Sequence, residues 1–501
     1  MKKTIFSLSL ACGLILVTFQ SCKEDFLEET NPNQLSLDTF FTTEDDAVNA
    51  VNSTYAALQR FELYKRKYFF LFDLLSDDVK GNDPLYADGQ TLSAYTFNAS
   101  SETVNDLWRG SYRGIQRSNF VLDNIGRLKE SAVTKRLVGE ALFLRALFYS
   151  DLVFNFGAVP LQLKSFSTES QGKERSPVAQ VWAQVETDLK AAEAVLPDSY
   201  GASDVGRATR WAAKGLLGRA YLYQKKYGEA ATKLKELIDY SRANPSKMGL
   251  TANFQDNFTE LGDNGEYVEF NKESLFEVSF AGQDRTGGTA NWNDDGAGGI
   301  GEGTFRAIEY GISAFQNTSP SNALVAAFPE NDPRKRLSMF GPGDTWYPNK
   351  IATPYPRSDW QHRKYSNLTK GGAGDDIQNF VGSSINMKVL RYADVLLMYA
   401  EALNQQGAVF SPEAVAAVNE VRARVKLPAI TATTGPQLFQ SIISERRFEL
   451  AFEQIRRKDI VRWGIAGAVL GTKFVTGTHE LLPIPQAELD LNNKLKQNPG
   501  Y

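Results

Sequence analysis

The chain has 501 residues, of which 42% are hydrophobic and 12% aromatic, enough for a large core in one domain or two closely joined ones. Its formal net charge is −4 and no block of like charge stands out, which argues against nucleic-acid binding, since that needs a basic surface. The only cysteines are Cys12 and Cys22, so the remaining 479 residues offer neither a thiol nucleophile nor a cysteine-based zinc site.

The N-terminus has the pattern of a bacterial lipoprotein signal. Two lysines precede an apolar stretch, Ile5 to Phe19, that is too short to span a bilayer comfortably. The motif that follows resembles a lipobox, although leucine is commoner at its first position: Phe19-Gln20-Ser21-Cys22. We therefore predict a signal peptide over residues 1–21 and a lipid on Cys22. The alternative is an ordinary cleavage site beside a chance cysteine.

From Thr43 onward, amphipathic helical patterns dominate. The spacing of apolar residues predicts helices over 44–58, around 108–119 and over 135–156. The last is apolar almost all round, so it should be buried between other helices, and its charged residues should form structural ion pairs: Glu140, Arg145 and Asp151. Two Ser-Pro pairs, at 176–177 and 411–412, each read as the N-cap and first residue of a further helix.

Two segments have the spacing of a tetratricopeptide helix pair. The clearer one comprises Leu217-Gly218, Tyr221, Ala230 and Leu234, and a looser copy runs over 395–418. In such a pair the small residues let two helices approach closely while the large ones fill the space between them. We predict a mainly α fold in which such pairs form a scaffold, an α–α superhelix.

Residues 253–384 differ from this scaffold because the helical period fades and Gly, Pro, Asn and Asp become frequent. Residues 274–280 alternate between apolar and polar side chains, which predicts a short strand. Two irregular stretches, 282–303 and 341–374, are expected to be long loops. Because binding residues usually lie on loops held by a rigid base, we expect the ligand in this loop-rich half.

The tryptophans separate by context. Those on periodic helices are expected in the core: Trp108, Trp182, Trp211 and Trp463. Five other rings lie where no apolar stripe explains them: Trp292, Trp346, Tyr347, Tyr355 and Trp360. One face of a pyranose carries C–H groups that stack on an aromatic ring, so these five are candidate glycan contacts. The alternative is that they only fix their loops.

Two segments of the glycine-rich stretch 282–303 resemble known ligand-binding motifs. Residues 296–301 fit G-x-G-x-x-G, but a dinucleotide site needs a strand before it and a helix after it, and neither is indicated. Residues 291–302 have the spacing of an EF-hand calcium loop, although it begins with Asn and lacks flanking helices. Calcium is the one cofactor this leaves open, with candidate ligands Asn291, Asn293, Asp295 and Glu302.

Catalytic patterns are absent from the sequence. It contains two histidines, no H-E-x-x-H and no G-x-S-x-G. Acidic pairs at 77–78 and 375–376 could be imagined as a glycosidase acid and nucleophile, but among 59 acidic residues such pairs are expected by chance, in solvated loops. We predict no catalytic residues.

Ten short segments occur in a telling order: Phe40–Ala47, Gly139–Ala146, Gly157–Leu161, Gly206–Thr209, Asn331–Arg334, Arg391–Ala402, Glu445–Leu450, Asp459–Trp463, Leu482–Pro485 and Gln497–Tyr501. Together they resemble the SusD/RagB family of outer-membrane nutrient-binding lipoproteins, and the resemblance runs nearly end to end. One departure is Gln454-Ile455, where the family usually has a glycine just before an arginine.

The resemblance implies tetratricopeptide helices that cradle an irregular ligand-binding half, over 22–250 and 251–501 as one packed unit. It implies a lipid-anchored, non-enzymatic protein on the extracellular face of the outer membrane, which binds oligosaccharide and delivers it to a SusC-like TonB-dependent transporter. Lys23-Glu24-Asp25 is similar to the export signal of such lipoproteins. The loop before the 108–119 helix tends to face the ligand in the family, which adds weaker candidates: Asn82, Tyr86 and Phe97. The alternatives are a scaffold that binds only protein partners and a glycoside hydrolase.

Overall fold

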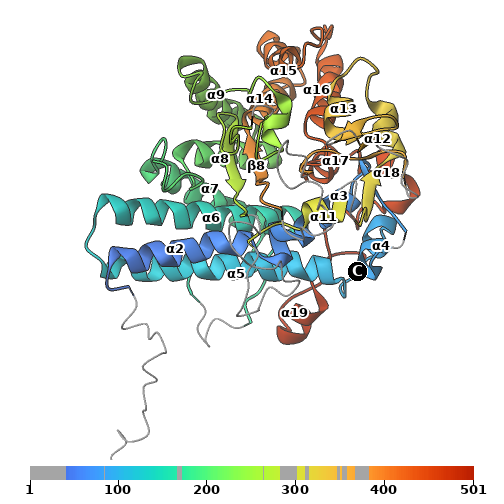
Figure 1. Cartoon of the computed structure of the whole chain (residues 1–501). Coiled ribbons are helices and arrows are strands. Elements are labelled where there is room, and N and C mark those ends of the chain that lie inside the picture. Colours follow the sequence, from blue (N-terminus) through green and yellow to red (C-terminus); the bar gives the residue numbers. More distant parts are fainter. Residues whose placement is uncertain are drawn as a thin grey trace, which may run out of the picture.

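The computed structural model describes residues 41–83, 85–165, 172–262, 265–281, 302–310, 315–346, 350–351, 358–366 and 383–501. Within these ranges the fold is mainly helical (Figure 1). The α-helices are α2 Glu44–Leu58, α3 Lys67–Leu74, α4 Ala87–Ala94, α5 Glu102–Asn124, α6 Ala132–Phe156, α7 Val178–Val195, α8 Arg210–Tyr223, α9 Tyr227–Ala243, α11 Arg306–Tyr310, α12 Asn322–Ala327, α13 Arg334–Ser338, α14 Tyr392–Gln405, α15 Pro412–Arg424, α16 Gly435–Glu449, α17 Arg456–Arg462, α18 Ala466–Leu470 and α19 Gln486–Leu491.

The helices stack in chain order. Helices α2, α5 and α6 lie side by side as one layer (Figure 1), and α7, α8, α9 and α14 follow, each packed on the one before. Helices α15 and α16 pack on α14 at the far end. This array is the predicted superhelical scaffold. No helix in the described part of the chain is long and apolar enough to cross a bilayer.

The expected helix boundaries are largely confirmed. Helix α2 has the bounds expected from the sequence, and Thr43 caps it by accepting the N–H of Asp46. Ser411 caps α15 as predicted, with Pro412 in the first turn. The prediction for Ser176 is wrong: its N–H donates to the carbonyl of Val159 at 2.9 Å in an isolated β-bridge. Helix α7 therefore begins only at Val178, with no side-chain cap.

Helix α6 is the buried central helix that its sequence predicts, and its charged residues form the expected ion pairs. Arg145 donates to Asp188 at 2.7 Å, Arg207 donates to Glu140 at 3.1 Å, and Lys458 donates to Asp151 at 2.6 Å. All three α6 residues are buried. Because each charge has a partner, the helix can bury them without an unpaired ion.

The predicted tetratricopeptide pair is α8 with α9. Gly218 of α8 lies directly against Leu234 of α9, where an added Cβ would stand 2.6 Å from the leucine Cδ2. The missing side chain at Gly218 thus sets the distance of closest approach between the two helices. The looser copy corresponds to α14 and α15, which also pack on each other.

A testable case of such close packing is the crossing of α5 and α6. A Cβ added to Gly114 of α5 would stand 2.2 Å from the buried ring of Phe148 of α6. We expect Gly114→Ala to destabilise the protein by about 1–3 kcal/mol through overpacking, even though alanine favours a helix interior by about 1 kcal/mol. Gly126→Ala is the matched control, since no atom lies within 4 Å of its added Cβ. Equal urea midpoints for both variants would contradict this account.

The described residues contain four two-stranded antiparallel sheets: β1 Val79–Gly81 with β3 Thr318–Pro320, β2 Ser274–Val278 with β8 Met387–Arg391, β4 Met339–Phe340 with β7 Gln361–His362, and β5 Thr345–Trp346 with β6 Lys350–Ile351. All these strands belong to the irregular half except β1, which joins the N-terminal half to it. The strand predicted over 274–280 is β2. It is buried because it lies on the helical scaffold, with Phe276 in edge contact with Phe143 of α6 at 4.8 Å between ring centroids.

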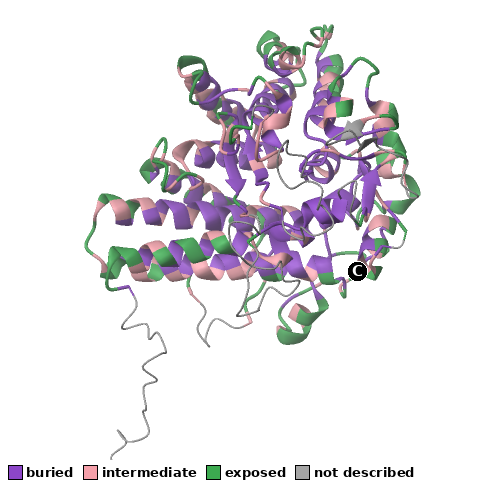
Figure 2. Ribbon diagram, viewed as in Figure 1, coloured by how far each residue is buried: buried purple, intermediate pink, exposed green. Residues whose placement is uncertain are grey.

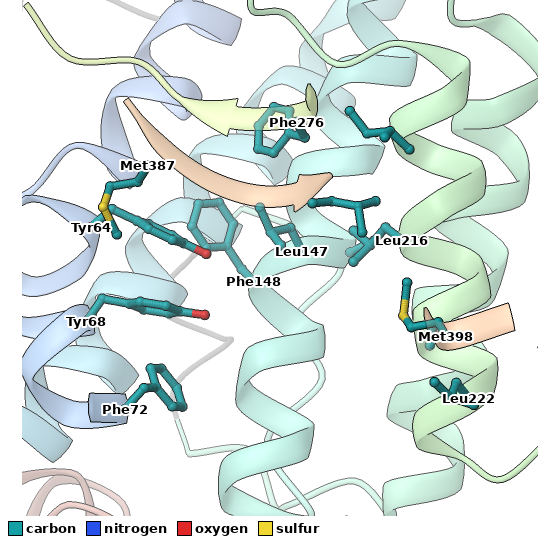
Figure 3. Close-up of a cluster of buried hydrophobic side chains, with 14 of the residues drawn as sticks. Tyr64, Tyr68, Phe72, Leu147, Phe148, Leu216, Leu222, Phe276, Met387 and Met398 are labelled. Carbon is teal, nitrogen blue, oxygen red and sulfur yellow. The ribbon is translucent and has the colours of Figure 1, made fainter. Parts of the chain in front are cut away.

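Both halves share one large hydrophobic core. Figure 2 shows the buried residues concentrated where the helices face one another, and the exposed ones on the outer sides. At its centre, Tyr64, Tyr68 and Phe72 lie opposite Leu147 and Phe148 of α6, with Leu216, Leu222, Phe276, Met387 and Met398 around them (Figure 3). This core crosses the boundary at residue 250, so neither half packs alone.

Candidate functional site

The tryptophans expected in the core divide into two groups. Trp108 and Trp182 are buried, at 2% and 6% exposure, as predicted. Trp211 and Trp463 are only half-buried. Trp211 stacks on Tyr240 with 3.9 Å between centroids, and the Trp463 Nε1–H donates to Glu401 at 2.9 Å. Trp211 and Trp463 are therefore less buried than predicted, although both contact neighbouring side chains.

Of the five candidate rings in the loop-rich half, Trp360 is the one whose side chain lies in the described part of the chain. It comes directly before β7, is half-buried, and packs on a small apolar cluster that includes Leu324, Phe328 and Met339. Gly341 packs against the side of this ring: a Cβ added to Gly341 would stand 2.8 Å from the six-membered part of the indole. The ring is therefore fixed in place while part of it remains open to solvent.

Arg336 and Asp344 lie beside Trp360 and form a corner of the surface with it. The sequence analysis did not single out these two residues. The guanidinium carbon of Arg336 lies 4.8 Å from the Trp360 ring centroid, in cation–π contact. Arg336 also donates to Asp344 at 2.8 Å, and the same carboxylate accepts the N–H of Gly341 at 2.8 Å. The side chains of Arg336 and Asp344 are 48% and 23% exposed. A fixed indole beside an accessible guanidinium and carboxylate supplies the stacking surface and the hydrogen-bonding groups that a sugar needs.

The remaining candidates are placed as follows. Trp292, Tyr347 and Tyr355 lie outside the described residues, as does the side chain of Trp346, whose backbone is in β5. Asn82 is buried and donates to the Gln316 carbonyl at 2.7 Å and to Ser319. Phe97 is buried against His479 and Tyr501. These contacts account for Asn82 and Phe97 within the fold, so we do not retain them as ligand contacts.

Tyr86 is half-buried, and cations flank it. Its ring lies in edge contact with Phe70 at 5.3 Å, and the charged groups of Arg66 and Lys67 lie 5.3 and 5.2 Å from its centroid. Burial raises the pKa of its hydroxyl well above the usual range. Cations flank the Trp360 ring in the same way, so these contacts do not separate the two rings, and Tyr86 stays a candidate glycan contact.

The proposed calcium ligands Asn291, Asn293 and Asp295 lie outside the described residues, and Glu302 is exposed. Among the residues that the structure does describe, no group of three or more His, Cys, Asp or Glu side chains is placed to hold a metal ion.

The acidic pair at 77–78 corrects one expectation. Asp77 and Asp78 are buried rather than solvated. Asp77 accepts from Arg456 at 2.7 Å, and Asp78 accepts from Arg447 at 2.7 Å. Paired with guanidinium groups inside the protein, they are structural ion pairs. The pair at 375–376 lies outside the described residues.

Three carboxyl groups have a raised pKa, each chiefly because it is buried: Asp73 and Asp106 at about 6, and Glu269 at about 7. A raised pKa is typical of a catalytic acid, but structural burial has the same effect. None of the three lines the surface groove beside α2 or the one between α9 and α14. The cavity between Tyr68 and Lys458 has room for only about 30 Å³ of solvent, which suits a water molecule and not a sugar.

Glu269 gives a testable pH dependence. Its carboxyl accepts the N–H of Asn386 at 2.6 Å and the hydroxyl of Tyr267 at 2.7 Å, and the charge of Glu277 nearby adds to the effect of burial on its pKa. Since the folded-state pKa is raised, the folded protein binds the extra proton, and stability is lost as the pH rises from about 4.5 through about 7.

We expect Glu269→Gln, which keeps the shape and removes the charge, to stabilise the protein by on the order of 1–3 kcal/mol at pH 8 and by much less at pH 5. The measurement is the urea midpoint of both proteins across this range. A gain that does not change with pH would show that Glu269 is not the titrating group. Glu229→Gln, an exposed site on α9, is the control.

The segments that carry the family resemblance contact one another in space. Glu140 of the second segment pairs with Arg207 of the fourth. Arg446 donates to Asp394 and Asp459, both at 2.8 Å, and so connects three C-terminal segments. These residues are buried or nearly so, and their role is to hold the fold together.

The departure at Gln454 coincides with unusual backbone geometry. Gln454 has a φ of +59°, in the left-handed region that favours glycine. Its side-chain amide donates to Asp73 at 3.0 Å and to the Phe452 carbonyl at 2.9 Å. These two hydrogen bonds offset the strain of a side chain at this position.

Two family models match the chain: one described as "SusD family" over residues 272–479, and one described as "Starch-binding associating with outer membrane" over residues 25–222. SusD-like protein P2 of Formosa agariphila is 28% identical over 97% of this chain and 98% of its own length. Starch-binding protein SusD of Bacteroides thetaiotaomicron is 23% identical over 82% of this chain and 81% of its own length.

Solved structures agree. A structure described as "Laminarin binding SusD-like protein" is 28% identical, has a TM-score of 0.76, and matches 91% of this chain and 99% of its own. A SusD homolog from Bacteroides thetaiotaomicron, at 24% identity and a TM-score of 0.78, matches 93% of this chain and 99% of its own, which supports the fold.

Proposed function

Because the chain belongs to the SusD family, we propose that it is a glycan-binding protein that captures oligosaccharide without cleaving it. The observation that carries this proposal is the similarity along nearly the whole chain to a protein described as laminarin-binding. The corner formed by Trp360, Arg336 and Asp344 supports it with the side chains that a sugar site needs.

The test is a binding screen of the protein that lacks residues 1–22 against neutral and acidic oligosaccharides, read by calorimetry. We expect micromolar to millimolar affinity, since two or three stacking rings barely outweigh the cost of association. Each bound glycan is then incubated with the protein and assayed for new reducing ends. Their appearance would make the protein a glycoside hydrolase, and the absence of any glycan ligand would favour a scaffold for protein partners.

We further propose that the protein is anchored by a lipid on Cys22 to the outer membrane, faces the extracellular side, and passes its ligand to a SusC-like TonB-dependent transporter. The lipobox-like motif before Cys22 and the description of one matching family model as outer-membrane-associated support this. The described chain begins at Phe41, whose ring packs on Phe120 of α5 at 5.5 Å, so a tether from Cys22 would join the protein at that end of α5.

Replacing Cys22 by alanine is expected to abolish lipidation, because only that sulfur can accept the diacylglyceryl group. The measurement is metabolic labelling with a fatty-acid analogue, followed by fractionation of the membrane. The matched control is Cys12→Ala, which lies within the predicted signal. A Cys22→Ala protein that still carries label would refute the lipobox assignment.

A further inference from the structure

Helix α5 carries a row of three arginines that the proposed sugar corner does not use. Arg109, Arg113 and Arg117 stand four residues apart, so they follow one side of the helix at intervals of about 6 Å. The side chains of Arg109 and Arg113 are 51% and 33% exposed, and Arg117 is half-buried.

The carboxylates near this row are shared with other cations. Glu62, whose side chain is 6% exposed, accepts from Arg113 at 2.6 Å, lies 3.5 Å from Arg109, and also accepts from Arg60 at 3.2 Å. Asp106 accepts from Arg109 at 2.8 Å and lies 3.8 Å from the ammonium of Lys67.

Arg117 donates to a neutral group, the carbonyl of Ser53, at 2.5 Å. Burial first, and then the charges of Arg60 and Arg113, lower the pKa of Arg117, which is the direction expected where positive charge is in excess.

Three arginines at this spacing lower the stability of α5, and their contacts within the fold do not explain why they occur together. Like charges at i and i+4 destabilise a helix by a few tenths of a kcal/mol per pair. Some other surface cations in the described part of the chain form one-to-one pairs, such as Arg210 with Asp198, whereas Lys190 and Lys226 also share one carboxylate, Glu186, but do not form a row along one helix. In a chain with a formal net charge of −4, a row of arginines that must share their carboxylate partners is unusual.

We propose that the arginine row of α5 binds an anionic polysaccharide, through the carboxylate or sulfate groups of its repeating units. A regular row of guanidinium groups suits a linear polyanion, because each group can hold an acidic oxygen pair in two parallel hydrogen bonds. This goes beyond the proposed function, since it adds a charged contact surface separate from Trp360.

An anionic lipid surface fits the row less well. Membrane-surface helices place large apolar side chains beside their basic ones. The exposed large hydrophobic residues in the described part of the chain include none on α2 or α5.

The test compares polygalacturonate with its fully methyl-esterified form, which has the same backbone without the charge. We expect the protein lacking residues 1–22 to bind only the charged polymer, more weakly at 200 mM than at 50 mM salt. The double variant Arg109→Gln/Arg113→Gln should bind at least tenfold more weakly. Glu62 keeps Arg60 as a partner in this variant, so the fold should survive, which the melting temperature checks.

The matched control is Lys135→Gln/Lys235→Gln, which removes two surface charges at side chains that are 56% and 43% exposed. It should change affinity less than twofold. Equal losses in both double variants would overturn the proposal, and so would unchanged binding by the arginine variant. Arginine-dependent binding to anionic vesicles without binding to polygalacturonate would assign the row to a lipid surface instead. Neutral-glycan binding should be the same in all variants, which separates this test from that of the proposed function.

Discussion

Replacing Arg391 by leucine is expected to cost about 3–5 kcal/mol of stability, because it strips a buried cluster of its central cation. Arg391 is 1% exposed and donates to Glu453 and Glu273, each at 2.7 Å, and to Glu449 at 2.6 Å. Arg424, Lys364 and Arg334 still pair with parts of this cluster, but Arg334 is shared with Glu445 and Asp332, and the three carboxylates would lose the one cation that contacts all of them. An uncompensated buried charge is among the most destabilising changes a single substitution can make.

Urea unfolding measures the loss, and Arg210→Leu is the matched control. Arg210 is 40% exposed and pairs with Asp198 at the surface, so its removal should cost less than about 1 kcal/mol. The deficit of Arg391→Leu should shrink toward pH 4, where carboxylates without their partner become protonated. If Arg391→Leu is as stable as Arg210→Leu, the cluster does not stabilise the fold.

This cluster also shows where sequence reasoning ends. The segments around Arg391 and Glu449 were recognisable by their family resemblance, and a helix pair was predicted over 395–418. The pairing of Arg391 with Glu273, 118 positions away, follows from the approach of β2 to β8 and has no local pattern. Periodicity predicts which side of a helix is buried, but it does not say which charged residue meets which.

The tryptophans illustrate the same limit. An apolar stripe predicted that Trp211 faces inward, which is correct in direction, but it lies in the first turn of α8, where the ring stacks on Tyr240 and stays half-exposed. Burial depth depends on what lies above a helix, which its own sequence does not encode. Arg336 and Asp344 were not predicted as part of the Trp360 corner because the fold brings α13 and the turn at Gly341 to this ring, and no local sequence pattern indicates that.

Replacing Trp360 by alanine is expected to weaken glycan binding by on the order of 1–3 kcal/mol, the range measured for aromatic stacking on nucleic-acid bases. Since micromolar to millimolar affinity leaves little reserve, this loss should make binding undetectable at ordinary ligand concentrations. Stability should fall less, because the ring is only half-buried and its apolar cluster is small.

Trp108→Ala is the matched variant with the opposite expectation. Trp108 is 2% exposed and packs against Tyr112 and Phe156, so its removal should cost about 3–5 kcal/mol through the cavity it leaves. At a temperature where this variant remains folded, its glycan affinity should equal that of the unmodified protein. Calorimetric titration and melting temperature, taken on both variants, separate the two roles. If Trp360→Ala binds normally and melts early, Trp360 supports its loop and the sugar binds elsewhere.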